Sequence, residues 1–502
     1  MTLHQFISQK IYLFMGYASR RGFQILLVCF LSVGLIVSGC DSGGSNSGNG
    51  DSDNKVVVTN DITSDTKWTS ENTYILDGVV FVENDATLTI DPGTNIKARL
   101  SSEISNDDEA SALIVKTDGK IDASGTASSP IIFTSTEDDL SDPSDLGPDN
   151  SNLWSGVVLL GSAPTSENTA IQIDQIEGID ESVESASFGS SSPDPSDDSG
   201  TLKHVSIRHG GRALNGLNAT ASRIASLTLG AVGNGTTISH VEVFASVDDG
   251  VRWIGGNVHA DHLVAAFCSD NAFEWDTGFR GTGQYWFSVQ SGAVADHAGG
   301  FNGYDGDTSN DEYSDPVVSN VTFIGPSEGF SFEPPAARFS EGSAGEIYNS
   351  IFSDFPKKAL RIDDLGDGTN TRWNNDQLVV RSNVFFNFGA NDGADGDPIA
   401  DIVFGTSRDS KIAANNSYVD PKLGGIDRGR NGKLDPQPTN GSPVSAENPS
   451  YFENTNGTDS DYVSVSLSDI EDAGYVGAFD PGASSLWTTG WTKLSQDGYM
   501  VE

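Results

Sequence analysis

HVEVFASVDDGVRW, residues 240–253, and HLVAAFCSDNAFEW, residues 262–275, are the two segments that decide the fold of this chain. They align without a gap at an offset of 22 residues, each with a histidine at its head, an aspartate in the middle and a tryptophan at its end. An offset of this size fits one coil of a parallel β-helix, which holds three short strands and their turns, and it stacks matching residues about 4.8 Å apart. The pair therefore predicts a solenoid whose equivalent side chains lie one above the other.

The opening tetrapeptide of these coils recurs at looser spacing. It is found as HVSI, NVTF, NSIF and NVFF at residues 204–207, 320–323, 349–352 and 383–386. Unequal intervals predict loops inserted between coils. A His or Asn at the head of each coil is a candidate ligand column, but side chains that hydrogen-bond along one turn of a β-helix also explain it, and we favour such a structural ladder.

The rest of the body has the pattern of short strands and turns. From Val56 onward, β-branched runs are cut by Gly, Asn, Asp and Pro, and no long run has a helical apolar period. The predicted fold class is all-β, a right-handed parallel β-helix over residues 55–492 with inserted loops, among them the Asp- and Ser-rich stretches 136–152 and 180–200. The aromatic end of this range is expected to cap an open end of the solenoid, and residues 493–502 to form a tail.

The first 39 residues have the layout of a signal peptide. A basic pair precedes an apolar stretch, residues 25–37, which runs into the sequence VSGC, and this end resembles the lipobox of bacterial lipoproteins. The resemblance implies that residues 1–39 are removed and that Cys40 is acylated. Residues 40–54, rich in Gly, Ser and Asn, then form a flexible tether between the lipid and the body.

The leader does not decide between two export routes or between the inner and the outer membrane. Residues 19–23 resemble a twin-arginine export motif, but the basic segment of an ordinary signal peptide explains them as well, and Met15 is a second candidate start. Asp41 is an inner-membrane retention residue in some lineages. We expect a lipid-anchored protein of the cell envelope, on the outer membrane or the cell surface.

The chain is strongly acidic, with 28 Lys and Arg against 71 Asp and Glu and a net charge of −43. Such a field repels nucleic acid, which excludes that class of partner. Because the acid is spread along the whole chain, we favour a solvated acidic surface, as in proteins adapted to high salt, over carboxylates gathered for divalent cations. The three cysteines, Cys29, Cys40 and Cys268, allow no disulfide within the mature body.

The densest group of chemically active residue types lies between residues 246 and 305. If Asp248 and Asp270 stack about 4.8 Å apart, their repulsion is roughly 3 kcal/mol at an effective dielectric constant near 20. Exposure to water, a bound cation such as Ca²⁺, or a raised pKa on one carboxyl would each offset it. The candidate calcium ligands are Asp248, Asp249, Asp270, Asn271 and Asp276. The candidate acids, bases and assisting groups of an enzyme are Asp248, Asp249, Asp270, Asp276, Arg280 and His297.

Four aromatic residues accompany this group, namely Trp253, Trp275, Tyr285 and Trp286. They are candidates for a platform on which sugar rings stack. A stack of indoles inside the core or at a turn explains the register of Trp253 and Trp275 equally well, so both interpretations stay open.

Segments spread over residues 56–492 resemble a family of secreted or lipid-anchored bacterial proteins predicted to be β-helical solenoids of the pectate-lyase-like kind. The segments that carry the resemblance are IIFTS, WSGVVLLG, HVSIRHGG, LTLGAVGNGTTISHVEV, DDGVRWIGG, FCSDNAFEWDTGFRGTGQYWF and YVGAF followed by GWT. The resemblance implies the fold and exposure at the cell surface, and it implies no established activity.

Two functions fit these observations. An anchor, a tether and a long scaffold without a complete catalytic set indicate a non-catalytic envelope protein that mediates adhesion or binds a glycan or a partner protein, with Ca²⁺ as a candidate stabilising ion. The alternative is a polysaccharide lyase or glycoside hydrolase that acts through the acidic residues between 248 and 297. That alternative rests on analogy with β-helical enzymes that use paired aspartates.

Overall fold

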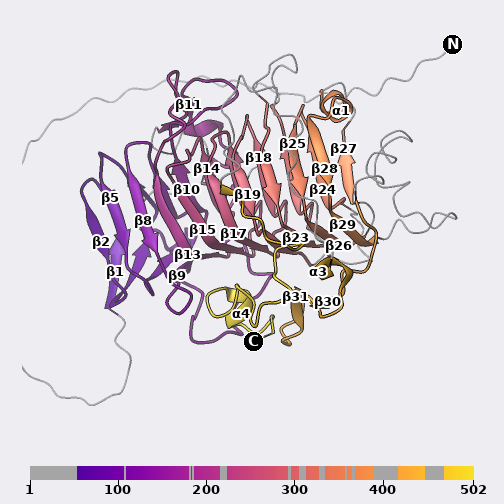
Figure 1. Cartoon of the computed structure of the whole chain (residues 1–502). Helices are drawn as coiled ribbons and strands as arrows, with labels where there is room; N and C mark the ends of the chain where they lie inside the picture. Colours follow the sequence, from indigo (N-terminus) through magenta and orange to yellow (C-terminus); the bar gives the residue numbers. More distant parts are fainter. Residues whose placement is uncertain are drawn as a thin grey trace, which may run out of the picture. The chain divides into compact units, whose positions relative to one another are not determined.

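Parallel strands stacked in long ladders make up the body of the protein (Figure 1). The computed structural model describes residues 54–106, 109–179, 183, 186–214, 223–291, 295–304, 313–326, 334–356, 359–363, 368–388, 416–446 and 469–501. The predicted signal peptide, Cys40 and all but the last residue of the predicted tether lie outside these residues. Within the described ranges, no helix is both long and apolar enough to cross a membrane.

Two of the three ladders together form an 18-stranded sheet. The first ladder consists of β1 (Asn54–Val58), β3 (Asn72–Leu76), β6 (Asn95–Ala98), β9 (Ile131–Ser135), β13 (Gly200–Arg208), β15 (Thr237–Phe244), β17 (His259–Ala266), β20 (Phe287–Val289), β23 (Thr322–Ile324), β26 (Ile351–Phe355) and β29 (Val384–Phe388). The second ladder consists of β2 (Thr66–Trp68), β5 (Thr87–Ile90), β8 (Lys120–Ser124), the first halves of β13, β15 and β17, β19 (Thr282–Gln284), β22 (Val317–Ser319), β25 (Gly345–Tyr348) and β28 (Leu378–Arg381).

The third ladder is a separate nine-stranded sheet. Its members are β4 (Val79–Val82), β7 (Ala112–Val115), β10 (Gly156–Leu160), β14 (Leu227–Gly230), β16 (Val251–Ile254), β18 (Phe273–Asp276), β21 (Gly299–Asn302), β24 (Ala337–Ser340) and β27 (Leu360–Ile362). The remaining described elements are short: the hairpin strands β11 (Ile171–Gln172), β12 (Ser187–Phe188), β30 (Leu423–Ile426) and β31 (Leu434–Pro438), the helices α1 (Thr369–Asn374), α3 (Pro443–Ala446) and α4 (Lys493–Gln496), and the 3-10 turns η1 (Ser101–Glu103) and η2 (Ile173–Gln175).

The register of these ladders confirms the 22-residue repeat. Val241 pairs with Leu263 in the first ladder, and Trp253 pairs with Trp275 in the nine-stranded sheet. All strand pairs of the three ladders are parallel, and the inward side chains form a continuous apolar core. The predicted parallel β-helix with inserted loops is therefore confirmed.

A column of left-handed residues marks the bend between the second and first ladders. The strands β13, β15 and β17 bend at His204, His240 and His262, whose φ angles are 48°, 56° and 52°. Later coils place Tyr285, Asn320, Asn349 and Ser382 at the same bend, all with positive φ. Asn and His tolerate this region better than most residues, so the predicted His and Asn ladder is a backbone feature of the turn.

One member of the predicted ladder is out of register. Ile351 pairs with Val384, so Asn383 lies beside Ser350 and not beside Asn349. Asn383 is buried, its side-chain oxygen accepts a hydrogen bond from the Ser350 N–H at 2.9 Å, and its side-chain nitrogen donates to the carbonyl of Ile347 at 3.0 Å. It therefore stabilises the turn from the position after the bend.

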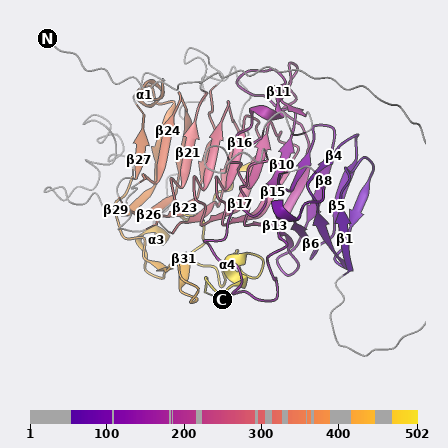
Figure 2. The same ribbon diagram turned by 180° about the vertical axis from the view of Figure 1, so that it is seen from behind.

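An insert covers the outer face of the nine-stranded sheet over its first coils. Outward side chains such as Ile114 and Val158 pack against Ile176 and Phe188 of the segment that carries β11 and β12. Both ribbon views place β11 over this end of the sheet (Figures 1 and 2). The prediction that residues 180–200 form a solvated loop is thus wrong for Phe188, which is 1% exposed.

The C-terminal segment lies along the side of the solenoid. Figures 1 and 2 show α4, β30 and β31 beneath the middle strands of the first ladder. The outward side chains of that ladder, Phe244, Val264 and Phe287, pack against Phe479 and Trp491. The aromatic segment is a side cover in this structure, and the predicted end cap is not confirmed.

The predicted tail covers residues 493–502, and its described part, residues 493–501, belongs to the fold. Lys493 and Leu494 are buried, and their backbone N–H groups donate to the carboxylate of Glu242 at 2.7 and 3.2 Å. The prediction failed because a buried acceptor on β15, far away in the sequence, holds the first turn of α4.

Candidate functional site

An acidic strip lies where each coil passes from the first ladder into the nine-stranded sheet. It consists of Asp248, Asp249, Asp270, Glu274 and Asp276, from two successive coils. The two-aspartate turn precedes β16, its counterpart one repeat later precedes β18, and the outward residues of the strands, Arg252 and Glu274, are paired in register. The strip is therefore a direct product of the 22-residue repeat.

Arg252 is the cation of the strip. Its guanidinium lies 2.6 Å from a carboxylate oxygen of Asp276, 3.6 Å from Glu274 and 3.4 Å from Glu177 of the insert. Burial alone would lower the pKa of Arg252, but Asp276 and Glu274 outweigh it and raise that pKa well above its usual value. One arginine thus neutralises part of the charge and fixes both strand carboxylates.

Asn271 is the hub of the other contacts. Its backbone N–H donates to Asp249 at 3.0 Å, and its side-chain nitrogen donates to Glu274 at 2.6 Å. Its side-chain oxygen lies 3.2 Å from Nδ1 of His297, which also lies 2.6 Å from Asp296. A side chain at Gly300 would meet the Asn271 amide at 2.6 Å, so only glycine fits beside this hub.

Burial raises the pKa of four carboxyl groups of the strip, those of Asp248, Asp249, Asp270 and Glu274. Burial, followed by repulsion from Asp270, raises the pKa of Asp248 to about 7. Burial, followed by Glu274, raises the pKa of Asp249 well above its usual value, and burial also raises the pKa of Glu274. The strip can therefore hold protons near neutral pH.

The strip does not gather its oxygen atoms around one point. Within the described ranges, the group of three His, Cys, Asp or Glu side chains whose donor atoms converge is a different one, His240, Asp261 and His262. The amide oxygen of Asn271, a predicted calcium ligand, faces His297 instead. Calcium at this position stays a prediction, and the geometry of the strip favours proton sharing over chelation.

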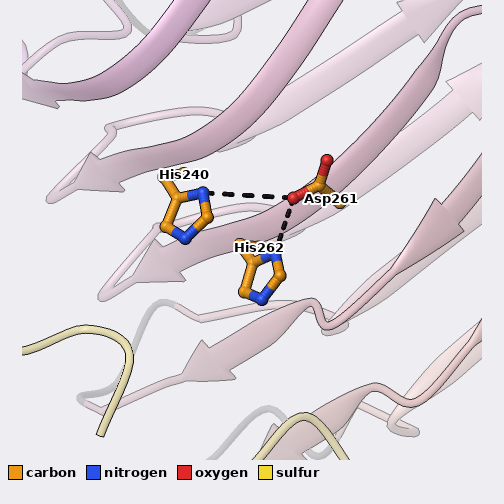
Figure 3. Close-up of side chains that lie close together, drawn as sticks. All are labelled: His240, Asp261 and His262. Atoms are coloured by element: carbon orange, nitrogen blue, oxygen red, sulfur yellow. Dashed lines mark hydrogen bonds and ion pairs between the residues drawn. The ribbon is translucent and has the colours of Figure 1, made fainter. Parts of the chain in front are cut away.

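The second constellation is a histidine cluster, defined as His240, His259, Asp261 and His262, on the outer side of the bend in β15 and β17. Figure 3 shows three of its members, His240, Asp261 and His262. Nδ1 of His262 lies 2.5 Å from Oδ1 of Asp261, and Nδ1 of His240 lies 4.0 Å from the same oxygen. The rings of His240 and His262 stack with centroids 4.3 Å apart and planes 10° apart. Nε2 of His259 lies 3.8 Å from the other oxygen of Asp261.

The cluster places imidazoles of lowered pKa, those of His240 and His259, beside one carboxylate. Burial, followed by the neighbouring His262 and His204, lowers the pKa of His240 to about 3. Burial alone would raise the pKa of Asp261, but the hydrogen bonds from His262 and Ser239 outweigh it and lower that pKa. The cluster thus offers a charged carboxylate oxygen beside the uncharged ring of His240.

Comparison with known families agrees with the ladders. The family described as pectate-lyase like beta helix domain matches residues 60–419, which include the acidic strip and the histidine cluster. The chain belongs to this family. No curated protein and no solved structure matches the chain.

In this pectate-lyase like beta helix, most of the predicted site residues meet. Asp248, Asp249, Asp270, Asp276 and His297 lie in or beside the strip. Arg280 is placed elsewhere: its Nε donates to the carbonyl of Tyr313 at 3.1 Å, and its charge acts on Asp315. Sequence analysis missed Arg252, although the repeat aligns Arg252 with Glu274 and so indicated an ion pair.

The predicted sugar-stacking platform is not present in this family member. Trp253, Trp275 and Trp286 are at most 1% exposed, and Trp275 stacks on Phe301 inside the helix at 3.6 Å. Strand alternation is the reason, because Arg252 points outward and Trp253 must then point inward. Tyr285, 7% exposed, packs against His262 at 4.7 Å at the bend.

Proposed function

We propose that the protein is a lipid-anchored envelope protein whose β-helix binds a glycan without cleaving it. The observation that carries the proposal is the outer face of the nine-stranded sheet, which is apolar and covered in its first coils and charged in its later ones. Its charged row, Arg252, Glu274, Arg338 and Arg361, follows the strand register with Gly300 between the second and third members.

The charged row has the dimensions and groups of a polymer-binding surface. Four strand spacings separate its ends, about 19 Å at 4.8 Å each. Arg338 and Arg361 both bind Asp363, at 2.6 and 2.7 Å, while 38% and 41% of their side chains stay exposed. Fixed guanidinium and carboxylate groups donate to and accept from sugar hydroxyls. A glycan that lies along the row would therefore meet prearranged hydrogen-bonding partners.

Burial of the best acid and base candidates supports binding over catalysis. Asp249 is 3% exposed and Glu274 is 9% exposed. A catalytic carboxyl has to reach the substrate within hydrogen-bonding distance. Asp249 instead accepts a hydrogen bond from the backbone N–H of Asn271, and Glu274 accepts one from the Asn271 side chain and lies 3.6 Å from Arg252. A net charge of −43 favours a neutral or amino-bearing glycan over a polyanion.

Calorimetric titration of the purified full-length chain in detergent, against neutral and amino polysaccharides, tests this function. We expect binding that the double substitution Arg338→Ala/Arg361→Ala weakens at least about tenfold. Lys67→Ala is the matched control, because Lys67 is an exposed, ion-paired cation on β2 of the second ladder. No binding to any polysaccharide, or equal loss in the control, would refute the proposal.

A polysaccharide-cleaving enzyme is the second candidate, and one observation favours it. The pKa of Asp248, raised by burial and by Asp270 to about 7, suits a general acid near neutral pH. Incubation with each polysaccharide that binds, followed by assay of reducing ends and of unsaturated products, separates the candidates. Product that disappears in Asp248→Asn would establish the enzyme, and absence of product from bound polymer would remove it.

Attachment through Cys40 is tested independently of the ligand. Metabolic labelling with a fatty acid is expected to mark the chain in cells, and Cys40→Ser is expected to abolish the label and release the protein from the membrane fraction. Cys268→Ser is the control, because Cys268 is buried in the core. Label retained after Cys40→Ser would contradict a lipid anchor at this position.

A further inference from the structure

The bend in β15 and β17 brings donor groups to one side of the solenoid. In a regular strand successive side chains alternate, but the left-handed residue at each bend breaks the alternation. Asp261 and His262 are consecutive and both partly exposed, between the buried Ala260 and Leu263. Ser239 and His240 repeat this pattern one coil earlier. Two ring nitrogens and a carboxylate therefore meet outside the core.

The donor atoms face a common point. Nδ1 of His240, Nδ1 of His262 and a carboxylate oxygen of Asp261 all lie within 4.8 Å of one another. In Figure 3 the Nδ1 edges of both rings turn toward the carboxylate. Nδ1 of His240 also hydrogen-bonds the Ser239 hydroxyl at 2.8 Å, and an ion bound beside Asp261 would replace that contact.

From this arrangement we infer that His240, Asp261 and His262 bind a divalent transition-metal ion of the Zn²⁺ type. Zn²⁺ takes imidazole nitrogen at about 2.0–2.1 Å and carboxylate oxygen at about 2.0–2.2 Å, with four ligands in tetrahedral geometry. Ca²⁺ and Mg²⁺ take oxygen ligands and fit two imidazoles poorly. Three protein ligands leave a fourth position for water or for a ligand of the ion.

Groups around the three ligands can orient them. The Ser239 hydroxyl donates to Oδ1 of Asp261 at 2.8 Å, and Nε2 of His259 lies 3.8 Å from Oδ2 of the same carboxylate. Trp487 of the C-terminal segment meets the rings of His240 and His262 edge-on, with centroids at 6.0 and 5.1 Å. Such neighbours fix ring orientation in metal sites.

The same bend in other coils lacks this donor set. The positions in register with Asp261 are Ser239 and Gln284, so the carboxylate belongs to one coil alone among these three. Further along the column, Asn320 is 1% exposed and its amide donates to the carbonyl of Tyr475 at 2.8 Å, which is a structural role. The histidine cluster differs because its ring nitrogens face a charged oxygen near the surface.

The test uses the full-length chain purified in detergent without a polyhistidine tag and stripped of metal with a chelator. Titration with ZnCl₂ is expected to show one ion bound per chain and a raised melting temperature, and CaCl₂ is expected to leave this site empty. His240→Asn, His262→Asn and Asp261→Asn are each expected to weaken Zn²⁺ binding at least about 100-fold, since even outer-shell changes cost 10–100-fold.

The substitutions are chosen so that the fold survives. Asn320 and Asn349 occupy the same left-handed bend in later coils, so asparagine fits the backbone at His240 and His262. His204→Asn is the matched control, because His204 stacks on His240 at 4.4 Å but lies outside the converging group, and it is expected to leave the affinity unchanged. X-ray absorption of the Zn²⁺-loaded parent protein, expected to show two imidazole ligands, decides the matter if a variant unfolds.

Three results would overturn the inference. One is an absence of Zn²⁺ binding by the parent protein, and another is binding that persists in both His240→Asn and His262→Asn. The third is an ion lost in Asp248→Asn or Asp249→Asn but kept in Asp261→Asn, which would place it on the acidic strip. None of these outcomes depends on whether the charged row binds a glycan.

Discussion

The acidic strip and the histidine cluster come from the same 22-residue repeat, yet the repeat has opposite electrostatic results in the two places. In the strip it stacks carboxyl groups, and burial raises the pKa of both Asp248 and Asp270, with added repulsion from Asp270 at Asp248 and from Asp296 at Asp270. In the cluster it stacks the imidazoles of His240 and His262 beside one carboxylate, Asp261, and burial lowers the pKa of His240. Stacking of identical side chains thus costs little free energy for groups that are neutral at pH 7, while stacked carboxyl groups need protons or a shared cation.

The largest effect is expected where that shared cation is removed. Arg252→Met leaves Glu274 and Asp276 without their partner in a mostly buried setting, which is expected to lower the free energy of unfolding by about 4 kcal/mol. Denaturant unfolding at pH 7 measures it. Arg361→Met is the control in the same charged row, with an expected loss under about 1 kcal/mol, because Arg361 is exposed and Arg338 still holds Asp363. Equal losses would mean that burial of the strip is unimportant.

The pH dependence of the strip is the next effect in size. The pKa of Asp248 is about 7 in the folded protein against an ordinary value of 3.8 for an aspartate in an unfolded chain, so between these values the folded state binds more protons. The contribution of Asp248 to the free energy of unfolding therefore falls as the pH rises through about 7, by about 3 kcal/mol between pH 5 and 8. Asp248→Asn is expected to remove this loss, and to be more stable than the parent at pH 8.

Unfolding measured at pH 5 and pH 8 for the parent, Asp248→Asn and Asp122→Asn completes this test. Asp122 is an exposed residue of β8, and its substitution is expected to leave the pH dependence as it is in the parent. A parent protein that is equally stable at both pH values, with Asp248→Asn no different, would contradict the raised pKa.

The histidine cluster is expected to respond to pH in the opposite direction. The pKa of His240 is about 3 in the folded protein against 6.5 unfolded, so below pH 6.5 the unfolded state binds more protons. The contribution of His240 to the free energy of unfolding is therefore lost as the pH falls, by about 2 kcal/mol at pH 5. His240→Asn is expected to remove this acid loss while it keeps the loss toward pH 8 that Asp248 causes. An acid loss in His240→Asn as large as in the parent would contradict the lowered pKa of His240; a smaller loss is expected to remain, because burial also lowers the pKa of His209 to about 3.

The sequence predicted the ladders and most of the strip because both depend on register alone. Once two coils align at 22 residues, Asp248 and Asp270 must be neighbours, whatever the rest of the chain does. The same register also predicts the contact between Arg252 and Glu274, because it places them side by side on neighbouring strands. Strand alternation predicts that Trp253 points inward, because Arg252 points outward. These features were predictable from residues already aligned.

The side cover could not be predicted in this way. Which side of the solenoid is left apolar depends on outward residues spread over many coils, such as Phe244 and Phe287, and on the buried acceptor Glu242. No local pattern links Glu242 to Lys493, 251 residues later. The convergence of Asp261 with the two histidines also needed the left-handed bend, because a regular strand would place Asp261 and His262 on opposite faces.

The smallest effect is expected for a substitution at the left-handed bend that alters no ion pair. His204→Asn replaces a ring by the residue that Asn320 and Asn349 supply at the same positive φ, and the change is expected to alter stability by less than about 1 kcal/mol. The ring stacks on His240 at 4.4 Å and meets Trp491 edge-on at 5.6 Å, so some packing is lost, while asparagine keeps the backbone of the bend. Thermal unfolding of this variant beside Arg252→Met measures the contrast directly. A loss near that of Arg252→Met would mean that the bend depends on stacked rings, and that the column is as specific as the strip.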